Sequence, residues 1–170
     1  MPLPLSEWKD FFVMIGTASG VIVGASFVVA TLAAEVKNRS LGMRGFITPT
    51  AVHLGSVLVG SAILAVPTLT AGSLAVLLGA GGLAGAVYSV IVCSRIWHLN
   101  LGLDDRLAYG LLPVAIYLAM AAAAVMVFWR VTETFEILAV SMVVLLIIGM
   151  RNAWDMANFM ITREKEPPSP

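Results

Sequence analysis

The stretch FFVMIGTASGVIVGASFVVATLAA, residues 11–34, contains no charged side chain and is the longest such apolar segment near the start of the chain. A helix needs about 20 mostly apolar residues to cross roughly 30 Å of hydrocarbon. Residues 11–34 meet this requirement, and four further stretches meet it at residues 49–67, 72–93, 107–129 and 135–157. The sequence therefore predicts an all-α fold, a polytopic membrane protein formed by a bundle of five transmembrane helices.

The composition agrees with a membrane protein and excludes several other classes. Of the 170 residues, 59% are apolar and 12% charged, whereas a soluble domain carries about 25% charged residues. So little charge cannot cover a surface that faces water. The chain contains a single cysteine, Cys93, which excludes a disulfide scaffold. Ten basic and ten acidic residues cancel, so we expect the lipid bilayer as a partner and no nucleic acid.

The five spans leave no room for a soluble domain, so residues 1–162 are expected to form one transmembrane domain. The tail, residues 163–170, is charged and rich in proline, which predicts a disordered segment. No phosphate-binding loop, catalytic triad or HExxH pattern occurs in the sequence, so we expect no enzyme, no catalytic residue and no cofactor.

The basic residues predict the orientation, because Lys and Arg are retained on the cytoplasmic side. The N-terminus and the loops after the second and fourth spans contain only Lys9 and Arg130. The segments at the opposite ends contain eight: Lys37, Arg39, Arg44, Arg95, Arg106, Arg151, Arg163 and Lys165. We therefore expect the N-terminus outside and the C-terminus in the cytoplasm.

The first span carries a line of small and hydroxyl-bearing side chains. At about 100° per residue, most of these positions share one arc of the helix. We call them the small-residue stripe: Gly16, Thr17, Gly20, Gly24, Thr31 and Glu35. Small residues let helices approach closely in lipid, so one interpretation is packing within or between protomers. The other is an oligomeric pore lined by the stripe, with Glu35 at its cytoplasmic mouth favouring cations.

The arrangement of the helices can also be anticipated. Ser19, Ser26 and Ala30 lie opposite the stripe, so the first span has two small faces and is expected to be the central helix of the bundle. The connection between the second and third spans is short and uncharged, which predicts a tight antiparallel hairpin. Pro113 lies near the start of the fourth span, where it is expected to kink the helix and free a carbonyl.

Ionisable and polar side chains gather where the spans meet the predicted cytoplasm. We call them the cytoplasmic polar cluster: His53, His98, Asp104, Asp105, Arg151, Asp155 and Asn158. Three of them, at positions 151, 155 and 158, share one helical face and form a polar ridge with an i,i+4 ion pair. Salt bridges that fix the register are one interpretation, and a site for a headgroup, anion or metal is the other. Because the spacing matches no ligand motif, we expect no metal.

Several stretches together carry a resemblance to a known family. They are GTASGVIVGASFV at residues 16–28, TPTAVH at 48–53, DDR at 104–106 with LLP at 111–113, and IGMRNAWD at 148–155. They resemble an uncharacterised family of small bacterial inner-membrane proteins with five predicted transmembrane helices. The resemblance covers most of the chain and implies a location in the bacterial inner membrane. It implies no activity and transfers no catalytic residues.

Two functions remain open at this point. The first is a homo-oligomeric membrane protein that acts as a small channel or passive permeation pathway, lined by the small-residue stripe. The second is an accessory or assembly subunit of a larger membrane complex, without intrinsic transport, which would present the polar ridge to its partner.

Overall fold

The helices of the computed structural model follow the apolar stretches of the sequence. The structure describes residues 5–35, 41–97 and 106–163. Within these ranges, five helices are long and apolar enough to cross a membrane, which confirms the all-α five-helix fold. The elements in chain order are α1 (Leu5–Glu35), α2 (Leu41–Ala65), α3 (Ala71–Trp97), the π-helix η1 (Leu107–Leu111), α5 (Leu112–Phe128) and α6 (Thr134–Arg163).

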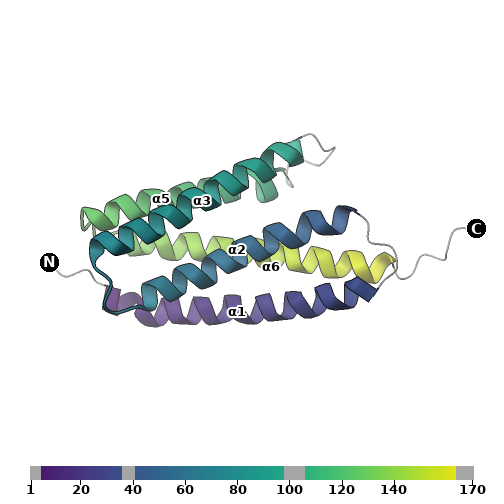
Figure 1. Ribbon diagram of the computed structural model, residues 1–170, viewed down its shortest axis with the longest axis horizontal. Helices are drawn as coiled ribbons and strands as arrows, with labels where there is room; N and C mark the ends of the chain where they lie inside the picture. The colour runs from purple at the N-terminus through teal and green to yellow at the C-terminus, as the bar shows by residue number, and fades with distance from the viewer. Residues whose placement is uncertain (1–4, 36–40, 98–105, 164–170) are drawn as a thin grey trace, which may run out of the picture.

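The helices form two layers (Figure 1). One layer contains α1, α2 and α6, and the other contains α3 and α5. The main partner of α3 is α5, and α2 packs chiefly against α1 and α6. The short connection expected between the second and third spans is confirmed, because α2 ends at Ala65 and α3 begins at Ala71. The tight packing expected between them is wrong, because α2 and α3 touch only lightly.

Close backbone contact explains why α3 prefers α5. A Cβ atom added at Gly82 would lie 2.8 Å from the backbone nitrogen of Ala121 and 3.1 Å from the carbonyl oxygen of Tyr117. Only a glycine fits at this position, and small residues are the usual means by which helices associate in lipid. The glycines of α3 thus allow its inner face to pack closely against α5.

The central helix is α6 and not α1. The span Thr134–Asp155 of α6 packs against α1, α2 and α5, and 50% of its apolar window is buried. Only 22% of the corresponding window of α1 is buried, and α1 packs chiefly against α2 and α6. The expectation that the first span has two packed faces is therefore wrong, because one of its two small faces points away from the other helices.

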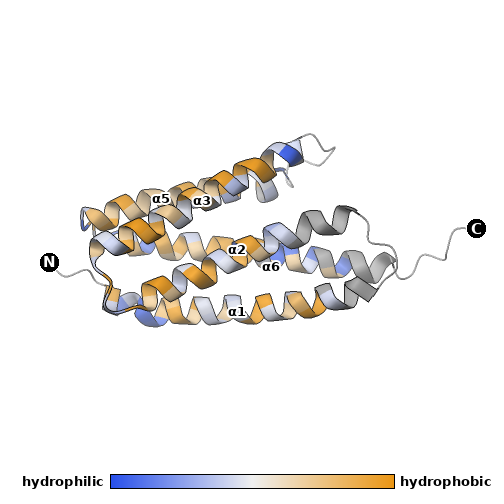
Figure 2. Ribbon diagram, viewed as in Figure 1, coloured by the Kyte–Doolittle hydropathy of each residue, from blue (hydrophilic) through white to orange (hydrophobic). Residues whose placement is uncertain are grey.

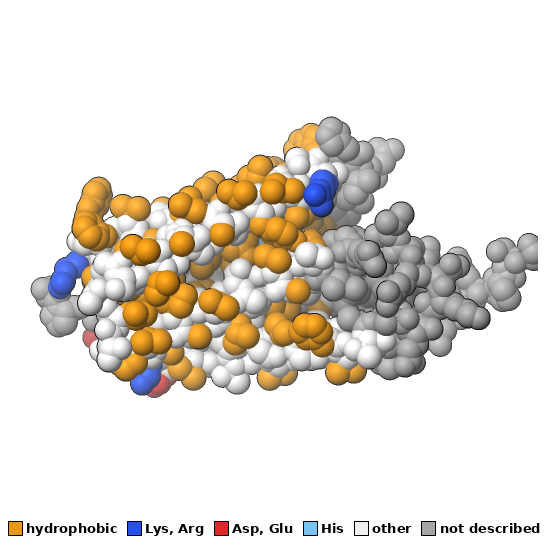
Figure 3. All heavy atoms as spheres, in the orientation of Figure 1, with side chains coloured by type: hydrophobic (Ala, Val, Ile, Leu, Met, Phe, Trp, Pro, Cys, Tyr) orange, Lys and Arg blue, Asp and Glu red, His pale blue; other side chains and the backbone are white. Residues whose placement is uncertain are grey.

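The surface of the bundle is apolar around its middle. Figure 2 shows apolar residues along the central part of each helix, with hydrophilic ones towards the ends. On the face drawn in Figure 3, the charged side chains that are visible lie near the two ends of the bundle. The helix α1 begins and α6 ends at opposite ends of the molecule, as five crossings require (Figure 1). These features are those of a protein inserted into a membrane.

Candidate functional site

The small-residue stripe of α1 is divided by the fold. Gly16 is buried, and a Cβ atom there would lie 2.8 Å from the Cβ of Ser61 in α2. Gly20 is half-buried, and a Cβ atom added there would lie 3.8 Å from Cδ1 of Leu58 in α2. Gly24 is exposed, and no atom lies within 4 Å of the position a Cβ would take. Packing inside one protomer accounts for Gly16 and Gly20 but gives Gly24 no neighbour among the residues that the structure describes.

The hydroxyl-bearing members of the stripe are also exposed. Thr17 donates a hydrogen bond to the carbonyl oxygen of Val13, and Thr31 donates one to that of Phe27, each at 2.8 Å. Neither threonine hydroxyl reaches another helix through these bonds. Glu35 is the last residue of α1. The outward face of α1 therefore carries Thr17, Gly24 and Thr31 along its length.

A different face of α1 makes the contacts with the rest of the bundle. Phe12, Ile15 and Gly16 are buried there, and Ser19 is fully buried and donates a hydrogen bond of 2.7 Å to the carbonyl oxygen of Leu54 in α2. These positions follow the i, i+3, i+4, i+7 pattern of one helical face. The sequence contained this pattern, but the surrounding valines and isoleucines made every face of the helix look suitable for packing.

The first polar contact between the two layers involves His53, a member of the cytoplasmic polar cluster. His53 is 3% exposed, and its Nδ1 lies 3.1 Å from the hydroxyl oxygen of Tyr117 in α5. Tyr117 donates its proton to Ser56 Oγ at 2.9 Å, and Ser56 in turn donates to the carbonyl oxygen of Val52 at 2.8 Å. Because each hydroxyl has one proton to donate, His53 must carry its proton on Nδ1 and donate it to Tyr117.

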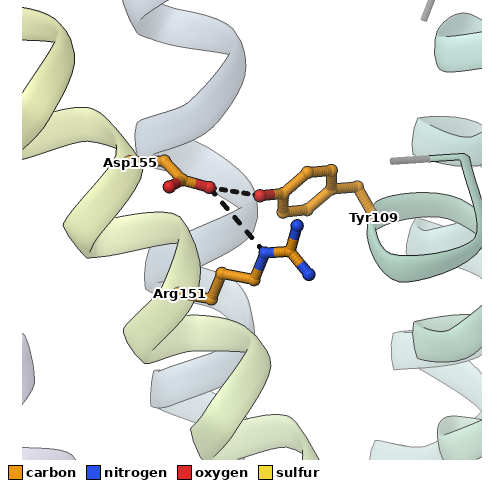
Figure 4. A network of polar contacts seen from close by, with 3 residues as sticks. All are labelled: Tyr109, Arg151 and Asp155. Atoms are coloured by element: carbon orange, nitrogen blue, oxygen red, sulfur yellow. Dashed lines mark hydrogen bonds and ion pairs between the residues drawn. The ribbon is translucent and has the colours of Figure 1, made fainter. Parts of the chain in front are cut away.

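The second polar contact joins the polar ridge of α6 to the π-helix (Figure 4). The hydroxyl of Tyr109 donates a hydrogen bond to Oδ2 of Asp155. Nε of Arg151 lies 4.0 Å from the same oxygen, which confirms the predicted i,i+4 pair. The guanidinium carbon of Arg151 also lies 5.3 Å from the centre of the Tyr109 ring, in a cation–π arrangement. The carboxylate of Asp155 thus contacts both Tyr109 of η1 and Arg151 of its own helix, α6.

The position of Tyr109 follows from Pro113. A proline has no N–H, and its ring clashes with the carbonyl four residues earlier, which here is that of Tyr109. The chain accommodates the clash by widening to a π-helix over Leu107–Leu111, where Leu112 donates to the carbonyl oxygen of Leu107. Such π segments are frequent at functional sites. The expected kink at Pro113 stays a prediction; what the structure has directly before Pro113 is a π-helix, and Tyr109 lies within it.

The structure brings two members of the cytoplasmic polar cluster, Arg151 and Asp155, to Tyr109. His98, Asp104 and Asp105 lie outside the residues that the structure describes. Asn158 is exposed on α6, one turn beyond Asp155. Across the described ranges, no group of three His, Cys, Asp or Glu side chains is placed to hold a metal ion. What the structure adds to the cluster is two tyrosines of the α3–α5 layer.

Sequence reasoning missed these tyrosines, although a signal was present. The chain contains three tyrosines, and all of them fall in α3, η1 or α5, as Tyr88, Tyr109 and Tyr117. A tyrosine hydroxyl inside an apolar span needs a hydrogen-bond partner. Three such residues in one layer therefore suggested polar partners in the other layer, and the structure gives such partners to Tyr109 and Tyr117. Their partners could not be identified without the fold, because 64 residues separate His53 from Tyr117 in the chain.

Together, the fold and these contacts define a polytopic α-helical membrane protein whose two layers are joined by buried and boundary polar contacts. Comparisons of the chain with protein-family models, with curated proteins and with solved structures found no match.

Proposed function

We propose that the protein is a homo-oligomer of the bacterial inner membrane whose protomers meet on the outward face of α1, where the small-residue stripe lines a passive permeation pathway. The observation that carries the proposal is the exposure of Thr17, Gly24 and Thr31 on a helix whose other face packs against α2 and α6. In lipid, small residues on an outward face favour helix–helix contact.

The chemistry of that face suits a path for small polar species. The hydroxyls of Thr17 and Thr31 bond to carbonyl oxygens of their own helix, and each keeps an oxygen that can accept a further hydrogen bond. Threonine oxygens and closely approached backbone can replace part of the hydration shell of an ion. Gly24 would allow neighbouring copies of α1 to approach, since no atom of the described part of the chain occupies the adjoining space.

The proposed orientation places the N-terminus outside and the C-terminus in the cytoplasm. It rests on the excess of Lys and Arg at one end of the bundle, the end at which Arg95 and Arg151 lie. The polar contact of Tyr109 with Asp155 would then lie at the cytoplasmic boundary of the membrane.

The alternative, an accessory subunit of a larger complex, depends on the polar ridge being available to a partner. Within the protomer, Asp155 already accepts a hydrogen bond from Tyr109 and lies beside Arg151. Part of the ridge is therefore already used within the protomer, while the side chains of Arg151 and Asp155 stay 53% and 44% exposed. The homo-oligomer is favoured by the exposed face of α1.

The proposal is tested by substituting Gly24 with leucine. Since the space beside Gly24 is open, Gly24→Leu leaves the protomer intact and obstructs only what lies outside it. We expect the variant to lose its oligomeric mass and, in liposomes, to release trapped K⁺ more slowly than the wild-type protein. Ala25→Leu is the matched control, because Ala25 is also exposed on α1 but lies about 100° away around the helix.

Two results would decide against the proposal. A Gly24→Leu protein with unchanged mass and unchanged K⁺ release would show that the stripe is not a contact. If Gly24→Leu and Ala25→Leu reduced the oligomeric mass and K⁺ release equally, any large side chain on α1 would have the same effect, and the stripe would have no special role.

A further inference from the structure

A groove runs along the side of the bundle between α2 and α3. Its volume is about 420 Å³, and it is floored by Tyr117 and Met120 of α5. It exists because α3 packs on α5 and only lightly on α2, and because glycines line both walls. At Gly55 of α2 and Gly81 of α3, the space that a side chain would take is open.

The groove lies at membrane depth. Its α2 wall falls inside the span Thr48–Ala65 and its α3 wall inside the span Ala71–Arg95. Two of its lining side chains, Val59 and Leu77, are 57% and 43% exposed, so the groove reaches the outer surface of the bundle. Figure 3 shows the face that α2 and α3 form, with hydrophobic side chains over its middle. A molecule would therefore enter the groove from the hydrocarbon of the bilayer.

The lining combines apolar walls with three hydroxyl groups and carries no charged side chain. Two of the hydroxyls, on Tyr117 and Ser56, already donate their protons within the protein. The third belongs to Tyr88, which is half-buried and makes no hydrogen bond to another residue that the structure describes. The groove thus offers one unused donor, on Tyr88, and an oxygen of Ser56 that can accept a second bond.

From this lining we propose that the groove between α2 and α3 binds a neutral amphiphile of the bilayer, one acyl chain carrying hydroxyl and ester oxygens, as in a monoacylglycerol. The chain would lie along the glycine-lined walls, and the head oxygens would pair with Tyr88 and Ser56. The volume falls within the range of about 300–1,000 Å³ that is usual for small-molecule sites. An anionic head is disfavoured, because the lining supplies no cation to pair with it in a low-dielectric setting.

The test uses the purified full-length protein and monooleoylglycerol that carries a photoreactive diazirine near the middle of its chain. We expect cross-links to map to peptides of α2 and α3. Gly81→Leu fills the groove and should weaken binding of the probe by about tenfold or more. Ala80→Leu is the matched control, because Ala80 is exposed on the same helix and does not line the groove; its binding should equal that of the wild type.

A second set of variants tests the chemistry and guards against misfolding. Gly55→Leu fills the groove from α2, where the space is equally open, and should reproduce the loss. Tyr88→Phe removes only the donor and should weaken monooleoylglycerol by roughly two- to tenfold, the effect of one hydrogen bond. The proposal is overturned if both leucine variants bind as the wild type does, if the cross-links map to α1, or if oleate competes as well as monooleoylglycerol. None of these variants touches α1, so the outcome is independent of the oligomer.

Discussion

Tyr117 is the residue that joins the interior of one layer to the other. Its side chain is fully buried, and its hydroxyl both accepts from His53 and donates to Ser56. Hydrogen bonds between membrane helices contribute about 0.6 kcal/mol on average, with a maximum near 1.7 kcal/mol. A residue that makes two such bonds at a buried site lies at the upper end of this range.

Tyr117→Phe is therefore expected to lower the free energy of unfolding by about 1–2 kcal/mol, because the Nδ1 proton of His53 loses its acceptor. The measurement is equilibrium unfolding in mixed micelles with increasing SDS. In the Tyr117→Phe background, where the bond from Tyr117 to Ser56 is already lost, Ser56→Ala should not lower the free energy of unfolding further through that bond. Additive losses in the double variant would contradict the hydrogen-bond chain.

Gly82 and Gly81 are adjacent glycines with opposite surroundings. An added methyl group at Gly82 would meet the backbone of α5, whereas at Gly81 it would meet open space. Gly82→Ala is expected to reduce the free energy of unfolding by about 1–3 kcal/mol, the usual cost of overpacking. Gly81→Ala should be neutral or slightly stabilising because alanine favours the helix. Equal effects of the two substitutions in the same unfolding assay would show that α3 and α5 are not packed as described.

At the scale of single elements, the π-helix connects Pro113 to the contact between Tyr109 and Asp155. In Pro113→Ala, residue 113 regains an N–H and the segment Leu107–Leu111 can close into a regular α-helix. The side chain of Tyr109 would then turn away from Asp155. We therefore expect the coupling between Tyr109→Phe and Asp155→Asn in a double-mutant cycle to be about 0.5–1 kcal/mol in the wild-type background, a modest value because Asp155 is 44% exposed.

In the Pro113→Ala background, the same cycle should give no coupling. A coupling energy that survives the loss of the proline would mean that the π-helix does not position Tyr109. The wild-type cycle is the control, since it shows whether the contact is measurable at all.

The elements themselves could be predicted from hydropathy, but their neighbours could not. Residues 11–34 and the other four apolar stretches each became a helix, because a segment in lipid must satisfy its own backbone hydrogen bonds. Hydropathy does not reveal which face of α1 turns inward, because lipid is as apolar as a protein core. The central position of α6 and the separation of α2 from α3 depend on tertiary contacts of Gly149, Gly82 and Gly85, which composition cannot distinguish from glycines that face lipid.

The candidate site was predictable to a similar extent. The ion pair of Arg151 with Asp155 followed from helical spacing alone, since it is local. The partners of His53 and Asp155 are tyrosines far away in the chain, and only the tertiary fold brings them close. The stripe of α1 was recognised as a set, yet the fold separates buried Gly16 from exposed Gly24.

At the scale of the whole molecule, the orientation in the membrane can be measured directly. Glu133 and Ser94 are exposed at opposite ends of the bundle. In a Cys93→Ala background, Glu133→Cys should react with an impermeant maleimide added to intact spheroplasts, and Ser94→Cys should react only after lysis. The reverse labelling would place the N-terminus in the cytoplasm and contradict the distribution of basic residues.

Among the residues that the structure describes, the two-layer bundle leaves one face of α1 without neighbours, and a second copy is proposed to cover this face. The most direct test is native mass spectrometry of the wild-type protein released from nanodiscs under mild conditions. A single symmetric homo-oligomer is expected, with masses at a multiple of the 18.0 kDa chain. A monomer, or a complex containing a different polypeptide, would contradict the proposed association through α1.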